Sequence, residues 1–142
     1  MEKRIRKYRD EKQYDLSCSE AMIYAANEKY NLGLTESHFK MMAPFSGGMY
    51  DGDTCGVVTG AIAVLGLVFT NNVSHNSPLL KEAVLEYKAS FEELLGSRVC
   101  NTLLETQRDD IEGCNTIILD GGKLLEEVIE KYSKLNLSLI HI

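Results

Sequence analysis

Residues 55–70, CGVVTGAIAVLGLVFT, form an apolar segment without a single acidic or basic side chain. The length of this segment suits a helix better than a strand, although its valines leave a strand open. A helix that is apolar on every face has to be covered by other parts of the fold. We therefore expect residues 55–70 to form a central helix against which the rest of the chain packs.

Signals for the start and end of helices precede this segment. Ser17 followed by Glu20 has the spacing of a capping box, and Asn31 supplies a stop signal for the helix that begins after Ser17. Thr35 starts a shorter helix that has to end before Pro44. The region before the apolar segment is therefore expected to be helical.

Similar signals divide the second half of the chain into three helices. Ser77 and Pro78 suit the N-cap and first position of a helix that Gly96 ends. Ser97 and Asp110 suit the N-caps of a short helix and of a long final one. The apolar stripes expected to be buried comprise Leu80, Val84, Tyr87, Phe91, Leu94 and Leu95 in the first helix, and Ile111, Cys114, Ile118, Leu125, Val128 and Tyr132 in the last.

Together these signals predict an all-α fold, a compact helical bundle of about five to seven helices around the glycine-rich apolar helix 55–70. We expect residues 1–142 to form one helical domain. Residues 2–12 predict a short charged helix, with the basic cluster 3–9 as a solvated face. Residues 136–142 are expected to be a tail that is loosely ordered or packs on a partner.

The charge and the N-terminal sequence limit the classes of partner and compartment. The formal net charge of −6 argues against nucleic acid and against an anionic membrane surface. The charged N-terminus has no apolar region typical of a signal peptide, and the longest apolar run is too short and glycine-rich for a membrane span. We expect a cytoplasmic protein, in which cysteines serve as buried thiols, metal ligands or redox thiols rather than structural disulfides.

The four cysteines all lie near predicted helix starts. The predicted N-caps place Cys18 directly after Ser17, Cys55 in the first turn after Asp53 or Thr54, Cys100 third after Ser97, and Cys114 about fourth after Asp110.

Unpaired backbone N–H groups and the helix dipole favour negative charge at a helix start, and such a position can lower the pKa of a cysteine. The alternative for any one of these cysteines is an inert thiol buried in the core. The chain has no C-x-x-C pair, which argues against a thioredoxin-type dithiol and a zinc ribbon. Any site that the cysteines share must therefore be assembled by the tertiary fold.

The order of the cysteines resembles a known family. SCSEAM, TCGVVTGAIAVLGL, GSRVCNTLLE and EGCNTIILDGGKLLEEV resemble the four elements of the redox-active family named for its C…CGAxxG…C…C pattern, the C_GCAxxG_C_C family. The resemblance covers about residues 14–130 and all four cysteines, and Val57 replaces the alanine of the motif. It implies a small helical protein that is redox-active or binds metal. The expected partner is a redox partner or a transport-linked protein.

The glycines beside Cys55 predict close contacts. Gly in a helix costs up to about 1 kcal/mol relative to Ala, which is tolerable where another backbone or a cofactor must come near. Gly56 and Gly60 are therefore candidates for close approach to a cofactor, although tight helix packing, which would also account for Gly66, is the simpler explanation. Gly121 and Gly122 predict a kink or a close helix contact in the last helix.

Three classes of function remain open. In the first, Cys18, Cys55, Cys100 and Cys114 are redox thiols that exchange dithiol and disulfide or transfer electrons, so that the protein would be a thiol-dependent oxidoreductase. In the second, the same four cysteines hold an iron–sulfur cluster or another soft metal. In the third, the protein is a structural or adaptor protein with buried thiols. A homo-oligomer is compatible with each of these functions.

Overall fold

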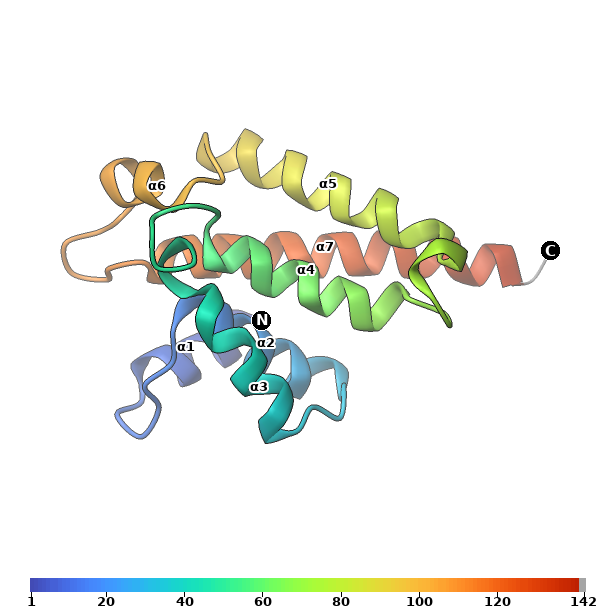
Figure 1. Cartoon of the computed structure of the whole chain (residues 1–142), viewed down its shortest axis with the longest axis horizontal. Coiled ribbons are helices and arrows are strands. Elements are labelled where there is room, and N and C mark those ends of the chain that lie inside the picture. Colours follow the sequence, from blue (N-terminus) through green and yellow to red (C-terminus); the bar gives the residue numbers. More distant parts are fainter. Residues whose placement is uncertain (141–142) are drawn as a thin grey trace.

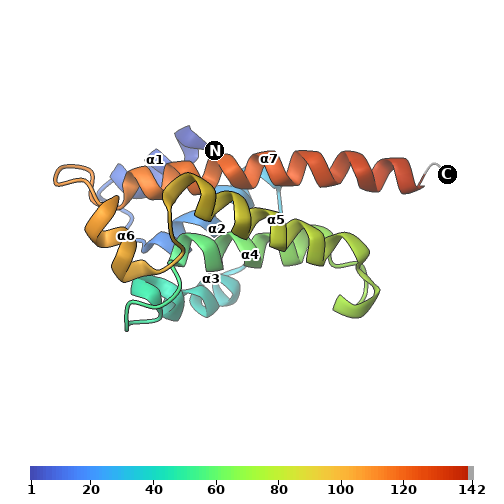
Figure 2. The same cartoon turned by 90° about the horizontal axis from the view of Figure 1, so that it is seen from above.

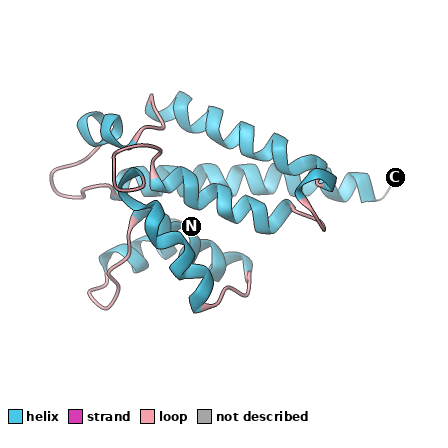
Figure 3. Cartoon of the chain, viewed as in Figure 1, coloured by secondary structure: helices cyan, strands magenta, loops and turns pink. Residues whose placement is uncertain are grey.

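The computed structural model describes the backbone of residues 1–140 and the side chains of residues 1–135. Its α-helices are α1 (Glu2–Asp10), α2 (Cys18–Tyr30), α3 (Glu36–Met42), α4 (Gly56–Phe69), α5 (Pro78–Leu95), α6 (Cys100–Thr106) and α7 (Asn115–Ile140), with 3-10 turns η1 (Ala43–Gly48) and η2 (Ser74–Asn76). The described residues contain seven α-helices and no strand, which confirms the all-α prediction (Figure 3).

Helix α4 lies at the centre of the helical packing. It packs against α2, α5, α7 and η1. Figures 1 and 2 show α4, α5 and α7 running lengthwise together, with α6 at one end. The prediction of a central helix is therefore confirmed, although Leu67 remains 50% exposed beside the part-buried Ala63 and Val68.

Several of the predicted helix ends are confirmed. Ser17 forms a capping box in which its Oγ accepts the N–H of Glu20. Thr35 caps α3, where its own N–H donates to Nδ1 of His38. Gly96 ends α5 with a φ of 86°, a left-handed conformation that glycine adopts without strain. Local side-chain hydrogen bonds fix the first two of these ends, and the backbone conformation of glycine fixes the third.

Three predicted helix starts are wrong. The N-cap of α4 is Cys55 itself rather than Asp53 or Thr54, and the N-cap of α6 is Val99 rather than Ser97. The reason is an antiparallel bridge between Thr54 and Val99, which keeps both segments extended up to the cysteines.

The third wrong start belongs to α7, which begins at Asn115 instead of directly after Asp110. A bridge between Asp109 and Gly113 folds the preceding residues into a turn. Ile111, which was expected on the buried stripe, is consequently 93% exposed at this turn. Leu94 is a further error, because it is 56% exposed while Ala83, Tyr87, Phe91 and Leu95 form the buried face of α5.

The basic cluster of α1 is not simply a solvated face. Helix α1 ends at Asp10, two residues before the predicted end. Arg6 and Arg9 are part-buried, and they contact Glu112 and Asn115 near the start of α7. The first helix is thus tied to a segment more than one hundred residues away in the sequence.

The last residues of the chain continue the final helix as far as the structure describes them. The backbone of residues 136–140 belongs to α7, and residues 141–142 of the predicted tail lie outside the described residues. Within the described part of the chain, no helix combines the length and the apolar character of a membrane span.

Most of the predicted glycine contacts are confirmed. A Cβ atom at Gly60 would lie 2.9 Å from the carbonyl oxygen of Ser19, and one at Gly56 would overlap the sulfur of Cys18. In α7, which runs on through both of its glycines, a Cβ at Gly121 would overlap Val57. The expectation is wrong for Gly66, where an added Cβ would have no neighbour within 4 Å.

Gly60→Ala and Gly66→Ala form a matched pair of substitutions in α4. We expect Gly60→Ala to lower the free energy of unfolding by about 1–3 kcal/mol, because the methyl group meets the backbone of α2. Gly66→Ala is expected to raise it by about 0.5–1 kcal/mol, because the methyl group enters open space in a helix. Urea unfolding followed by circular dichroism measures both changes, and equal signs would contradict the packing described.

Candidate functional site

The four cysteines line one small cavity where the starts of α2, α4, α6 and α7 meet. The cavity has a volume of about 120 Å³ and no charged lining residue, and is lined by Cys18, Gly47, Cys55, Val57, Cys100, Leu103, Leu104, Cys114 and Ile117. All four cysteines carry free thiols. The tertiary fold therefore brings together every cysteine that the sequence singled out.

Two loop segments fix the positions of Cys55 and Cys100. The N–H of Cys55 donates to the carbonyl of Arg98 at 2.7 Å, and the N–H of Cys100 donates to the carbonyl of Asp53 at 2.6 Å. Gly48, with a φ of 63°, lies against Cys100, where a Cβ on Gly48 would come within 2.8 Å of the Cβ of Cys100. The missing side chain of Gly48 therefore lets its loop approach the segment that carries Cys100. Backbone pairing thus holds the two thiols on neighbouring segments.

Cys18 reaches the cavity because Gly56 has no side chain. The sulfur of Cys18 occupies the space that a Cβ of Gly56 would need. Gly60 similarly leaves room for the backbone of Ser19 and the side chain of Met22. Both glycines, which were candidates for close approach to a cofactor, are thus covered by α2, and their contact with a cofactor stays a prediction.

Burial is the main influence on the pKa values of Cys18, Cys55 and Cys100. It raises the pKa of Cys55, which is 5% exposed, to about 12, although the N–H groups of Val57 and Val58 favour the thiolate. Burial also raises the pKa of Cys18 against the opposing N–H groups of Gly47 and Ser19, and that of Cys100. Helix starts can lower a thiol pKa, but here desolvation outweighs the backbone N–H groups at Cys18 and Cys55, and no backbone N–H group offsets it at Cys100.

Arg9 is a residue at this site that the sequence interpretation missed. Its guanidinium donates from Nε to the Asn115 side chain at 2.8 Å and from Nη1 to the Leu16 carbonyl at 2.6 Å. It also lowers the pKa of Cys18 by its charge, by less than burial raises it. The basic cluster of residues 3–9 was the available signal, but only the tertiary fold singles out one arginine.

The donor chemistry and the geometry give different answers on metal binding. Four thiols are a suitable donor set for iron–sulfur clusters and other soft metals. Within residues whose side chains are described, however, no three of the His, Cys, Asp and Glu residues are arranged to hold a metal ion. His38 lines a separate apolar pocket with Met41 and Met42. The thiols would have to move closer together to bind a metal.

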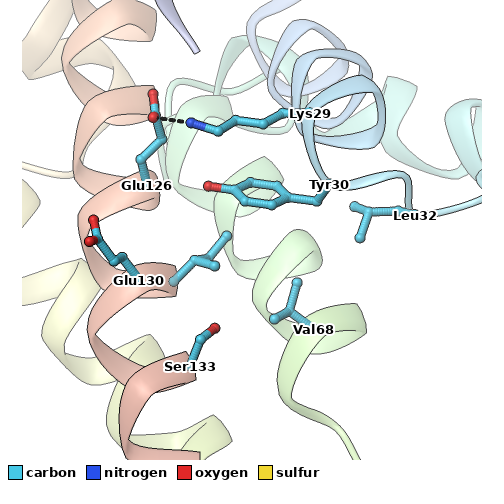
Figure 4. Close-up of a pocket in the computed structure, with 8 residues that line it drawn as sticks. Lys29, Tyr30, Leu32, Val68, Glu126, Glu130 and Ser133 are labelled. Carbon is cyan, nitrogen blue, oxygen red and sulfur yellow. Dashed lines mark hydrogen bonds and ion pairs between the residues drawn. The ribbon is translucent and has the colours of Figure 1, made fainter. Parts of the chain in front are cut away.

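A larger pocket lies between α2, α4 and α7, away from the cysteines (Figure 4). Its volume is about 560 Å³, and it is lined by Lys29, Tyr30, Leu32, Val68, Glu126, Ile129, Glu130 and Ser133. Lys29 forms an ion pair with Glu126, which also binds the N-terminal ammonium of Met1 at 2.8 Å. These charges tie helices together, and the lining has no cysteine, so we place the candidate site at the smaller cavity.

The fold and the cavity define a class of small all-α proteins in which four cysteines from distant parts of the chain share one site. The chain belongs to the family described as "Putative redox-active protein (C_GCAxxG_C_C)", whose sequence model matches residues 16–128. The matched region contains all four cysteines and leaves α1 outside it. No curated protein matches the chain, and no solved structure does.

The cysteines should differ in their rates of alkylation. In reduced protein at pH 8, we expect iodoacetamide to modify Cys55 at least about tenfold more slowly than Cys100, because Cys55 is more buried and holds its proton up to a pKa of about 12. Mass spectrometry of the digested protein measures the rate at each position. The same measurement in urea is the control, where the two rates should converge. Equal rates in the folded protein would contradict the described burial.

Proposed function

We propose that this protein exchanges electrons with a partner by converting pairs of the thiols Cys18, Cys55, Cys100 and Cys114 into disulfides and back. The observation that supports this proposal most directly is the convergence of all four thiols on one cavity. Four buried cysteines without a shared role would not be expected to lie at one cavity when they come from four separate helix starts. Membership of a family described as redox-active supports the same class of chemistry.

The proposed reaction is thiol–disulfide exchange. A thiolate of the protein attacks one sulfur of a partner disulfide, which forms a mixed disulfide and releases one partner thiol. A second cysteine then displaces the other partner sulfur. The protein gains one disulfide, the partner gains two thiols, and the two protons pass from the protein thiols to the partner sulfurs.

The raised pKa values impose a condition on this reaction. At neutral pH, burial keeps the thiols of Cys18, Cys55 and Cys100 mostly protonated. Since the thiolate is the attacking species, exchange with small dissolved disulfides should be slow. We therefore propose a dedicated redox partner, for which a transport-linked protein is one candidate, and place the exchange in the reducing cytoplasm.

Two alternatives use the same residues differently. An iron–sulfur cluster or soft metal bound by the four cysteines would make the protein a binding module or an electron carrier, and would require the thiols to come closer than they are in the described geometry. A structural or adaptor role would leave the thiols inert in the core. Each alternative predicts a different result in the same experiment.

The test is to purify the protein without oxygen, measure its metal content, and count free thiols in buffers of oxidised and reduced glutathione. We expect no stoichiometric metal and a reversible loss of at least two thiols in the oxidised buffer. A variant with all four cysteines replaced by serine serves as the control for the assay. Stoichiometric iron or another soft metal would favour the binding module, and an unchanged thiol count without metal would favour the structural role.

A further inference from the structure

The turn that precedes Cys114 is held together by hydrogen bonds within the turn. Asp109 exchanges backbone hydrogen bonds with Gly113, at 3.0 and 2.8 Å, and its carboxylate accepts the N–H groups of Ile111 and Glu112. These bonds are all internal to the turn, and Ile111 at its tip is 93% exposed. The turn is well formed locally, but other parts of the fold must fix its place beside the remaining thiols.

Helix α1 supplies this anchor. Arg6 forms an ion pair with Glu112, directly within the turn. Nε of Arg9 donates to Oδ1 of Asn115 at 2.8 Å, and the amide of Asn115 donates to Asp10 at 3.3 Å. Three residues of α1 thus contact the two positions that flank Gly113 and Cys114.

Arg9 also reaches the other cysteine segment. Its Nη1 donates to the carbonyl of Leu16 at 2.6 Å. Leu16 precedes Cys18 by two residues, and Asn115 directly follows Cys114. One planar guanidinium therefore bonds the segment before Cys18 and the residue after Cys114, and its rigid fork fixes the separation of these two segments better than a flexible ammonium would.

We infer that Arg9 is a positioning residue that holds Cys18 and Cys114 together as a disulfide-forming pair. This inference rests on the proposed thiol–disulfide function and adds a pairing and a residue to it. Both thiols are part-exposed and line the same cavity. Arg9 lies in α1, outside the region that the family match covers, so the match gives it no role.

Oxidised glutathione provides a defined reaction for the test. The thiols of Cys18 and Cys114 become one disulfide, and the glutathione disulfide becomes two thiols that take up the two protons. The equilibrium constant is measured in buffers of known glutathione ratio, with the linked peptides identified by mass spectrometry. In the wild-type protein we expect the disulfide to join Cys18 to Cys114.

The variants separate positioning from general stability. Arg9→Ala should lower the equilibrium constant about tenfold, which raises the potential by about 30 mV, because the two segments lose their common anchor. Arg9→Lys should resemble Arg9→Ala, since one ammonium does not replace both bonds. Arg4→Ala, on the same helix but next to Glu28, is the matched control and should leave the constant unchanged.

Asn115→Ala is the second test, because it removes one acceptor and keeps Arg9. It should also lower the constant, so a folding defect in Arg9→Ala leaves the inference testable. Unchanged constants in Arg9→Ala or Asn115→Ala, full rescue by Arg9→Lys, or a disulfide between other cysteines would overturn the inference alone. A wild-type protein that forms no disulfide at all would overturn the proposed function with it.

Discussion

The close packing of α2 on α4 is the contact on which the rest of the site depends. Gly56 and Gly60 remove the side chains that would keep the two helices apart, and Cys18 and Ser19 fill the space. A Cβ at Gly60 would press against Ser19 and Met22 of α2, and a Cβ at Gly56 would displace the sulfur of Cys18 from the cavity wall. The glycines of the apolar segment therefore place a thiol as well as packing a helix.

The same packing determines the chemistry of the thiols. Helix starts offer N–H groups to Cys18 and Cys55, which favours their thiolates, but the covering helices exclude water and the pKa values rise. Apart from the four cysteines, the cavity is lined only by a glycine and by aliphatic side chains. A site built in this way favours neutral thiols and depends on a partner or on nearby charge, such as that of Arg9, to form a thiolate.

The predictions that succeeded and those that failed differ in the range of the interactions involved. Ser17, Thr35 and Gly96 end or begin helices through bonds to residues within four positions, so the sequence reveals them. Cys55 and Val99 begin helices where they do because Thr54 pairs with Val99 across more than forty residues. Backbone pairing of this kind depends little on side-chain identity. A pattern of residues in the sequence therefore does not predict it.

The sequence by itself determined the helical class, the central apolar helix and the identity of the four cysteines, because periodicity, caps and composition are local properties. Only the tertiary structure decided that these cysteines share one cavity, that burial outweighs the helix dipole, and that Arg9 bonds the segments before Cys18 and after Cys114. Each of these depends on residues brought together from distant parts of the chain, and on how much water the surrounding helices exclude.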